Sequence, residues 1–414
     1  MMTELGLIEG FFGRPYEWRE RHELMRFLAP HGFGFYLYAP KADSHLRRRW
    51  AEPYPAPSLE ALAHFGADCR EAGVRFGIGL SPFELHLHQG KDWQAPLAAK
   101  LAELDQAGVE DLDILFDDMR GDVPDLAERQ SAIVHFAAER SGAKRILCCP
   151  SYYSDDPILD SAFGKRPPAY LEDLGRKLDP AIEIMWTGEE VVSREFSPGH
   201  LRRVAGQLGR RPFLWDNYPV NDGARMSQHL HLRAFAGRPG AIAPHVAAHG
   251  INLASQPWLS RIPALTLAES YSLGEDYEYG AAFDRAAKTV LGAELAEMLR
   301  RDLLALQDRG LDRLGDRRDR LRQRYSGNDH PAAAEIIAWL DGYWNVTDEL
   351  VQTQCARAPS VAKAGAELRR GGDDPVRDRL QLCLGEALVD RLERHLDRQR
   401  LLAFRHALPG EDVE

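Results

Sequence analysis

Cysteine is scarce in this sequence, and its spacing does not suggest structural or redox chemistry. The 414 residues include only 5 cysteines, with no Cys-x-x-Cys spacing and one adjacent pair, Cys148 and Cys149, that cannot easily bridge. The odd count does not predict a disulfide framework. A reducing compartment fits this composition best.

Long apolar runs are also missing. No stretch of 18 apolar residues occurs, and the first residues, MMTELGLIEGFFGRPYEW, lack a basic segment followed by a long apolar one. The sequence therefore predicts neither a secretory signal nor a membrane span. We expect a cytoplasmic protein.

A basic excess is lacking as well. Lys and Arg number 52 against 63 Asp and Glu, which gives a formal net charge of −11. Nucleic acid and anionic membranes attract basic surfaces, so we expect neither as a partner. The hydrophobic fraction of 44% is ample for a sizeable core.

Short apolar runs alternate with helix-length segments over the first 280 residues. The expected strands are 5–9, 33–38, 74–80, 112–116, 145–149, 182–186, 213–215 and one within 241–253. Expected helices between them include 22–29, 59–72, 95–107, 125–140, 169–178 and 199–209. Eight strand–helix units over roughly 250 residues predict an α/β fold, a (β/α)₈ TIM barrel, rather than an open doubly wound sheet. No GxGxxG motif follows the first strand.

The composition changes after about residue 280. Residues 281–406 are rich in Leu, Ala, Arg and Asp, with apolar residues at helical spacing. We therefore predict a catalytic barrel over residues 1–280 and a C-terminal α-helical domain over residues 281–414. This helical region is also the candidate interface for a homodimer.

Polar and aromatic residues follow most of the expected strands. The segments read EGFFGRP, YAPKAD, SPFELH, DDMRGD, CPSYY, WTGEE, WDNYPVND and HGINLASQ. Barrel enzymes build their sites from these strand ends. Carboxylates, amides, a lysine and aromatic rings are what a carbohydrate site needs, because polar groups bind hydroxyls and aromatic faces cover ring C–H surfaces.

Two adjacent carboxylates, Asp117 and Asp118, end the apolar run ILF. Neighbours in a regular strand point to opposite faces, so both can reach one substrate only where the strand ends. Two close carboxylates push their pKa values apart, which suits general acid–base catalysis. The alternative is that one caps a helix and the other is solvated. Adjacent residues cannot easily flank a scissile bond, which favours a mechanism in which the 2-acetamido group of the substrate itself attacks the anomeric carbon.

Seven motifs, in order, resemble those of the glycoside hydrolase family 84 β-N-acetylglucosaminidases, the family of protein O-GlcNAcase and its bacterial relatives. They are GLIEGFFGRPY, YLYAPKAD, ILFDDM, CPSYY, IMWTG, WDNYPVND and GINLASQ, within residues 5–275. The resemblance implies a (β/α)₈ barrel followed by helices. It also implies a retaining glycosidase, without cofactor or metal, that removes terminal β-linked N-acetylglucosamine from a glycoprotein or a small glycoside through an oxazoline intermediate.

The resemblance also implies roles for individual residues. Asp117 would orient and polarise the acetamide, and Asp118 would be the general acid and then the general base. The implied substrate-binding residues are Gly10 (through its backbone), Lys41, Tyr153, Trp186, Trp215, Asn217, Asp222 and Asn252. Three positions depart from the family pattern, because Phe12, Ala42 and Gly223 replace an expected tyrosine, acid and larger residue.

Other readings of the sequence stay open at this point. The chain could be a catalytically inactive sugar-binding barrel, or a hexosaminidase that acts on chitin, cell-wall or hyaluronan fragments. A metal-dependent hydrolase would use Asp117, Asp118 and a histidine. The segment HVAAH, with His245 and His249, has the spacing of two helical zinc ligands but lacks the glutamate of HExxH.

Overall fold

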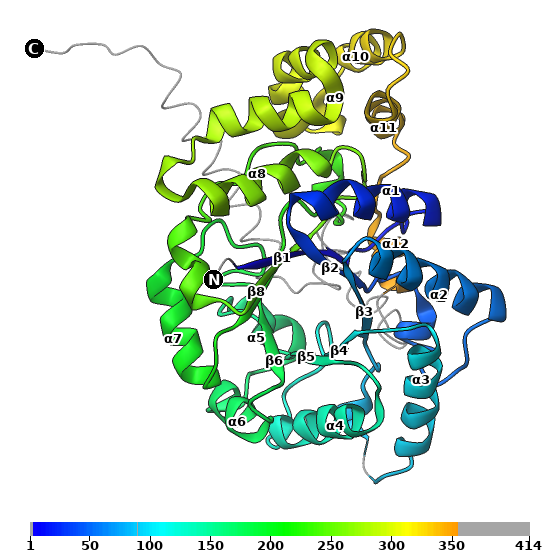
Figure 1. Cartoon of the computed structure of the whole chain (residues 1–414), viewed down its shortest axis with the longest axis vertical. Helices are drawn as coiled ribbons and strands as arrows, with labels where there is room; N and C mark the ends of the chain where they lie inside the picture. Colours follow the sequence, from blue (N-terminus) through cyan, green and yellow to red (C-terminus); the bar gives the residue numbers. More distant parts are fainter. Residues whose placement is uncertain (1–2, 89, 355–414) are drawn as a thin grey trace, which may run out of the picture.

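Eight parallel strands close into a barrel in the computed structural model, which describes residues 3–88 and 90–354. The strands are β1 (Glu4–Glu9), β2 (Phe33–Tyr38), β3 (Arg75–Leu80), β4 (Asp111–Leu115), β5 (Arg145–Cys149), β6 (Glu183–Trp186), β7 (Phe213–Asp216) and β8 (Ala248–Asn252). Each pairs with its sequence neighbours, and β8 pairs with β1 to complete the ring (Figure 1). The predicted (β/α)₈ barrel is confirmed.

Helices surround the barrel and bury one apolar face each against it. They are α1 (Trp18–Leu28), α2 (Ala56–Glu71), α3 (Gln94–Gln106), α4 (Leu126–Arg140), α6 (Tyr170–Lys177), α7 (Pro198–Leu208) and α8 (Arg261–Leu273), with the short α5 (Ile158–Phe163) in the connection after β5. The expected helix at 22–29 begins earlier, at Trp18, where Glu17 and Glu20 form a reciprocal capping box.

Charged residues close the amino-terminal end of the barrel. The first residues of five strands form a ring of ion pairs, in which Arg75 and Arg145 bridge Glu4, Asp111 and Glu183. Because these contacts join strands across the barrel, its amino end is filled by side chains. A substrate must therefore enter at the carboxyl end.

A second group of helices lies beyond α8 (Figure 1). These helices are α9 (Tyr279–Leu303), α10 (Arg317–Tyr325) and α11 (Pro331–Leu340), and they share a hydrophobic cluster built around Trp339 and Tyr325. This cluster also contains Leu230, Leu232, Leu259 and Ile262, which precede residue 280. The predicted division at residue 280 stays a prediction, and the two parts share side chains across it.

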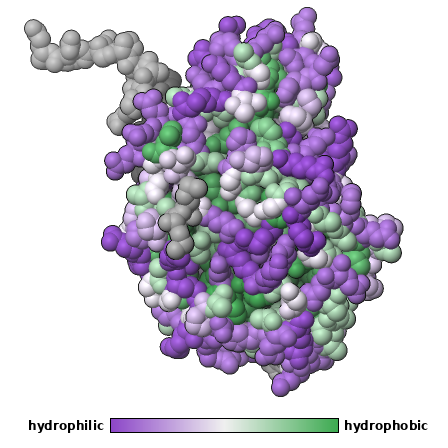
Figure 2. Space-filling view, in the orientation of Figure 1, coloured by the Kyte–Doolittle hydropathy of each residue, from purple (hydrophilic) through white to green (hydrophobic). Residues whose placement is uncertain are grey.

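The last described helix, α12 (Asp348–Gln354), lies apart from α9–α11 in Figure 1, and the Gln352 carbonyl of α12 accepts a hydrogen bond from Arg48 in the loop after β2. Residues 355–414, which belong to the predicted helical domain and dimer interface, lie outside the described residues. The surface seen in Figure 2 is mainly hydrophilic, with apolar residues scattered over it in small groups. No helix in the described part of the chain is long and apolar enough to cross a membrane.

Candidate active site

The predicted site residues lie at or just after the carboxyl ends of strands, and Trp186 is the last residue of β6. Gly10 follows β1, Lys41 follows β2, and Asp117 and Asp118 follow β4. Tyr153 follows β5, Trp215 lies in β7, Asn217 and Asp222 follow β7, and Asn252 ends β8. Because all eight strands are parallel in a closed barrel, these ends meet at one face.

Asp117 is a buried carboxylate with one hydrogen-bonded oxygen and one oxygen that has no hydrogen-bond partner among the described residues. Its side chain is 10% exposed, and Oδ2 accepts a hydrogen bond from the Lys41 ammonium. Burial opposes ionisation of Asp117, but the positive charges of Lys41 and Arg47 outweigh it and lower the pKa below its usual value. Oδ1 is buried and has no hydrogen-bond donor among the described residues. Asp117 can therefore accept a hydrogen bond from a ligand while staying ionised.

Asp118 has a backbone conformation that places its carboxylate beside that of Asp117. Its φ is +59°, a left-handed value that a non-glycine residue seldom adopts. The strand alternation that would send neighbours to opposite faces ends here, and Lys41 Nζ lies 3.6 Å from Asp118 Oδ2. The side chain is 23% exposed, against 10% for Asp117. One lysine thus contacts both acids, and Asp118 is the acid that water and substrate reach more easily.

The Tyr153 hydroxyl donates toward Asp118 Oδ1 at 3.5 Å. Burial, together with the negative charges of Asp118 and Asp117, raises the pKa of Tyr153 well above its usual value. This phenol therefore stays protonated and can donate a hydrogen bond at the acid pair.

An amide network forms another wall of the site. Asn217 Oδ1 accepts from the Trp215 indole at 3.0 Å and from Asn252 Nδ2 at 3.0 Å, and Asn252 Oδ1 accepts from the Gly10 N–H at 3.1 Å. Asn217 Nδ2 donates to the Val191 carbonyl at 2.8 Å. A Cβ on Gly10 would lie 2.3 Å from the Trp215 ring, so the close approach of β1 to this ring requires glycine. The network fixes the orientation of both amides and the indole.

Asp222 faces the same region from the loop after β7. Its Oδ2 accepts the Phe12 N–H at 2.8 Å. Burial raises the pKa of Asp222 to about 6, although the Phe12 N–H and the charge of Lys41 act in the opposite direction. Asp222 thus changes its charge in the pH range where many enzymes work.

A fully buried ion network supports β7 and β8 from behind. Arg238 donates to both oxygens of Asp216, at 2.8 and 2.7 Å, and His249 Nε2 lies 3.0 Å from Asp216 Oδ2. The other ring nitrogen of His249 lies 2.8 Å from the Tyr271 hydroxyl. These contacts account for His249 of the HVAAH segment without a metal. Among the residues that the structure describes, no three His, Cys, Asp or Glu side chains are grouped as metal ligands.

Trp186 does not join the site, which corrects the prediction that it binds substrate. Its side chain is fully buried, and its indole N–H donates to His200 Nε2 of α7 at 3.0 Å. The side chain therefore points out of the barrel and packs between β6 and α7.

Arg47 is a site residue that the sequence analysis missed. It is 3% exposed, Nη1 lies 3.4 Å from the Ser81 hydroxyl, and Nε and Nη2 have no hydrogen-bond partner among the described residues. It supplies a second positive charge near Asp117. In the sequence it lies within the run RRRW, where nothing separates a buried arginine from a solvated one.

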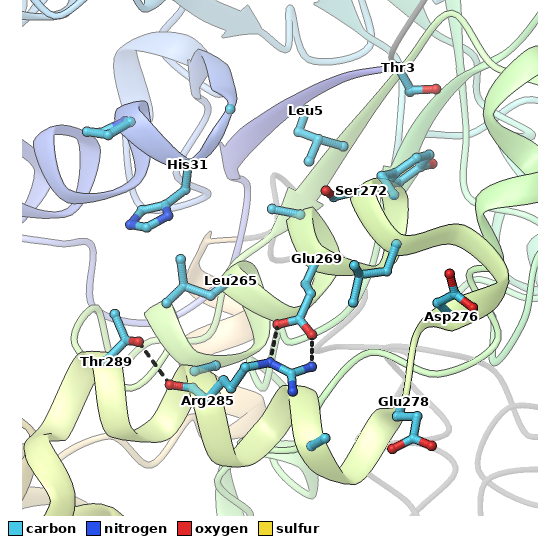
Figure 3. Close-up of a pocket in the computed structure, with 17 residues that line it drawn as sticks. Thr3, Leu5, His31, Leu265, Glu269, Ser272, Asp276, Glu278, Arg285 and Thr289 are labelled. Carbon is cyan, nitrogen blue, oxygen red and sulfur yellow. Dashed lines mark hydrogen bonds and ion pairs between the residues drawn. The ribbon is translucent and has the colours of Figure 1, made fainter.

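Two cavities lie away from the acid pair. One of about 970 Å³ lies at the amino-terminal end of β1, between α8 and α9, and the Glu269–Arg285 ion pair crosses it (Figure 3). Another of about 660 Å³ is lined by Trp18, Tyr38, Ala42 and Tyr54 beside the loop after β2. Neither is lined by any residue of the predicted sugar site, so these two cavities do not locate the chemistry.

Comparison with known proteins agrees with this geometry. The sequence profile of a family described as beta-N-acetylglucosaminidase matches residues 5–303. Protein O-GlcNAcase from Rattus norvegicus and that from Mus musculus are each 31% identical over 251 residues, which is 58% of this chain and 27% of each relative. The chain thus spans about a quarter of the length of these curated relatives. A solved aspartate-to-asparagine mutant of Thermobaculum terrenum O-GlcNAc hydrolase is 26% identical, with a TM-score of 0.68 and coverage of 99% of both chains.

Proposed function

This chain belongs to the beta-N-acetylglucosaminidase family, and we propose that it hydrolyses terminal β-linked N-acetylglucosamine by substrate-assisted catalysis with retention of configuration. The observation that carries this proposal is the arrangement of Asp117 and Asp118 on one strand end, with Lys41 contacting both. Two acids so placed cannot easily flank a glycosidic bond, as a nucleophile and an acid would. They can act on neighbouring atoms of one sugar.

In the first step, Oδ1 of Asp117 accepts a hydrogen bond from the acetamide N–H of the substrate. The acetamide carbonyl oxygen then bonds to the anomeric carbon, the glycosidic C–O bond breaks, and Asp118 gives its proton to the leaving oxygen. The product on the enzyme is an oxazolinium ion, the N-protonated form of the oxazoline, whose positive charge the ionised Asp117 stabilises. The charges of Lys41 and Arg47 favour this ionised state of Asp117.

In the second step, Asp118 accepts a proton from water. The water oxygen bonds to the anomeric carbon, the bond from the former acetamide oxygen breaks, and the acetamide is restored. Two inversions at one carbon give net retention. The greater exposure of Asp118 supports its role as the acid that exchanges protons with water.

Binding of the sugar follows from the remaining polar groups. Tyr153, Asn217 and Trp215 would surround the acetamide, and their mutual hydrogen bonds or buried positions keep them oriented. The groups that would bind the sugar hydroxyls are the Gly10 backbone, Lys41, Asp222 and Asn252. A fixed set of donors and acceptors lowers the entropic cost of orienting the substrate.

For the aglycone, we propose a glycoprotein or a small glycoside that bears N-acetylglucosamine. The names of the relatives support this choice, since they are called protein O-GlcNAcase and O-GlcNAc hydrolase. A hexosaminidase acting on chitin, cell-wall or hyaluronan fragments is the alternative. Comparing kcat/KM for a glycopeptide carrying one N-acetylglucosamine and for chitobiose decides between them. The cytoplasmic location and the homodimer stay predictions.

The activity itself is tested by release of nitrophenol from 4-nitrophenyl β-N-acetylglucosaminide. We expect turnover by the wild type and none by Asp117→Ala. Sugar binding without turnover by the wild type would instead favour an inactive sugar-binding barrel. Loss of activity after prolonged treatment with a chelator would favour the metal-dependent alternative.

A further inference from the structure

The chain returns from the helical group to the catalytic face over residues 341–354, which we call the return segment. Just before it, the Trp339 indole donates to the Ser227 carbonyl at 3.0 Å, and within it the Val346 N–H donates to the Ser227 hydroxyl at 3.1 Å. Arg48, in the loop after β2, then donates to the Gln352 carbonyl at 2.9 Å. The return segment thus runs from the loop after β7 to the loop after β2. These loops also carry Asp222 and Lys41.

The side-chain amide of Gln354, the last residue of α12, pairs with the backbone of Gly13. The Gly13 N–H donates to Gln354 Oε1 at 2.7 Å, and Gln354 Nε2 donates to the Gly13 carbonyl at 2.8 Å. Both hydrogen-bonding groups of one backbone residue are therefore satisfied by one side chain that is 341 positions away. Gly13 has a φ of +105°, so the loop turns sharply where the amide holds it.

This pairing fixes the backbone next to a predicted sugar-binding acid. The residue before Gly13 is Phe12, whose N–H donates to Asp222 Oδ2 at 2.8 Å. Two charged groups also affect the pKa of Asp222. Lys41, from the loop after β2, lowers it, and Asp118, from the loop after β4, raises it. Of the groups that affect the pKa of Asp222, the Phe12 N–H is the one carried by the loop that Gln354 holds.

We propose that Gln354 is a positioning residue for the sugar subsite, because its amide fixes the loop after β1 so that the Phe12 N–H meets Asp222. This inference rests on the proposed function, since Asp222 is taken to bind the sugar hydroxyls. It gives the C-terminal return segment a role in catalysis that the sequence did not indicate. The role is indirect, because Gln354 contacts Gly13 and not the acid pair.

Loss of the Gln354–Gly13 pairing should change the pH dependence of activity, which a loss of stability alone would not do. Gln354→Ala in the full chain removes two hydrogen bonds, and we expect kcat/KM on 4-nitrophenyl β-N-acetylglucosaminide to fall about 5- to 30-fold. The carboxylate of Asp222 also loses a well-placed donor, so its pKa should rise. The acidic limb of the kcat/KM profile should then move to higher pH by about half a unit or more.

A matched control is available on the same helix. The Thr353 side chain is exposed, and its hydroxyl donates to the Glu349 carbonyl within α12 at 2.8 Å. Thr353→Ala therefore changes the helix without changing its contact with Gly13. We expect this variant to keep the wild-type kcat/KM and the wild-type pH profile.

Amide hydrogen exchange tests the same pairing without reference to activity. In Gln354→Ala, the peptide that contains Phe12 and Gly13 should exchange faster than in the wild type and in Thr353→Ala. Unchanged exchange would overturn the inference, and so would faster exchange with an unmoved acidic limb. A wild type that releases no nitrophenol would contradict the proposed function, and exchange at Phe12 would still decide whether Gln354 fixes this loop.

Discussion

Replacing Asp222 by asparagine tests whether this half-buried acid controls the pH dependence of the enzyme. Asp222→Asn keeps the size of the side chain and an oxygen that can accept the Phe12 N–H, but it removes the charge and the titration. The wild-type carboxyl has a pKa of about 6. Asp117 stays ionised through this range because Lys41 and Arg47 lower its pKa. The ionisation of Asp222 should therefore govern the acidic side of the wild-type profile.

The expected size follows from that value. With a pKa of about 6, about nine-tenths of Asp222 is ionised at pH 7, half at pH 6 and about one-tenth at pH 5. If only the ionised form binds the sugar hydroxyls well, wild-type kcat/KM should fall about tenfold between pH 7 and pH 5. At pH 7 the variant should lose about 1.5–3 kcal/mol of transition-state binding, which is the usual contribution of a charged acceptor.

At neutral pH, Asp222→Asn should lower activity but raise the stability of the fold. Because the folded-state pKa of Asp222 is raised, protonation stabilises the fold, and that stability is lost as the pH rises from about 4 through 6. A shift from 3.8 to about 6 corresponds to at most about 3 kcal/mol, and partial exposure reduces this to about 1–2 kcal/mol. Asp222→Asn should therefore raise the Tm at pH 7.5 and leave it nearly unchanged at pH 4.

The assay is kcat/KM on 4-nitrophenyl β-N-acetylglucosaminide from pH 5 to pH 8, with thermal unfolding of the same samples. The variant should give a flat profile between pH 5 and pH 7. A variant that keeps the wild-type acidic limb would refute the assignment of that limb to Asp222. An activity loss below about threefold at pH 7 would place Asp222 outside the sugar site.

Two further predictions concern the acid pair. Asp118→Asn should lose about 10²–10⁴-fold in kcat on substrates with poor leaving groups and much less on activated aryl glycosides, because a good leaving group needs little protonation; equal losses on both would remove Asp118 from the role of general acid. Lys41→Met should raise the pKa of Asp117 through loss of a charge-assisted hydrogen bond, so activity should appear only at higher pH. Lys41→Arg keeps the charge and should keep the wild-type acidic limb. A Lys41→Met variant that also keeps the wild-type acidic limb would contradict this role of Lys41.

The barrel could be predicted from the sequence because its strands are short apolar runs at regular intervals. The expected segments 33–38 and 145–149 match β2 and β5 at both ends. Helix ends were less predictable, since α1 begins at Trp18, after a capping box, and not at residue 22 as expected. Periodicity therefore identified the elements, and local side-chain contacts set their limits.

The site could be predicted only where the residue type and its place at a strand end were informative. Trp186 shows the limit, because β6 (EIMW) carries buried apolar residues on both faces and its sequence does not show which of them face the barrel interior. Arg47 and Gln354 show another limit. Arg47 acts on Asp117 through its charge, and Gln354 forms hydrogen bonds with Gly13. Both effects arise only in the folded chain, and neither residue stands in a motif.

The most direct test of the central claim, that the substrate supplies its own nucleophile, is a series of aryl glycosides in which fluorine replaces the acetyl hydrogens one at a time. Fluorine makes the acetamide oxygen less nucleophilic, and this oxygen gains positive charge in the transition state. We predict that kcat/KM of the wild type falls with each added fluorine and that mass spectrometry detects no sugar bound to either aspartate. A flat series, or an adduct of one sugar on Asp117 or Asp118, would contradict the claim and would point to a carboxylate nucleophile.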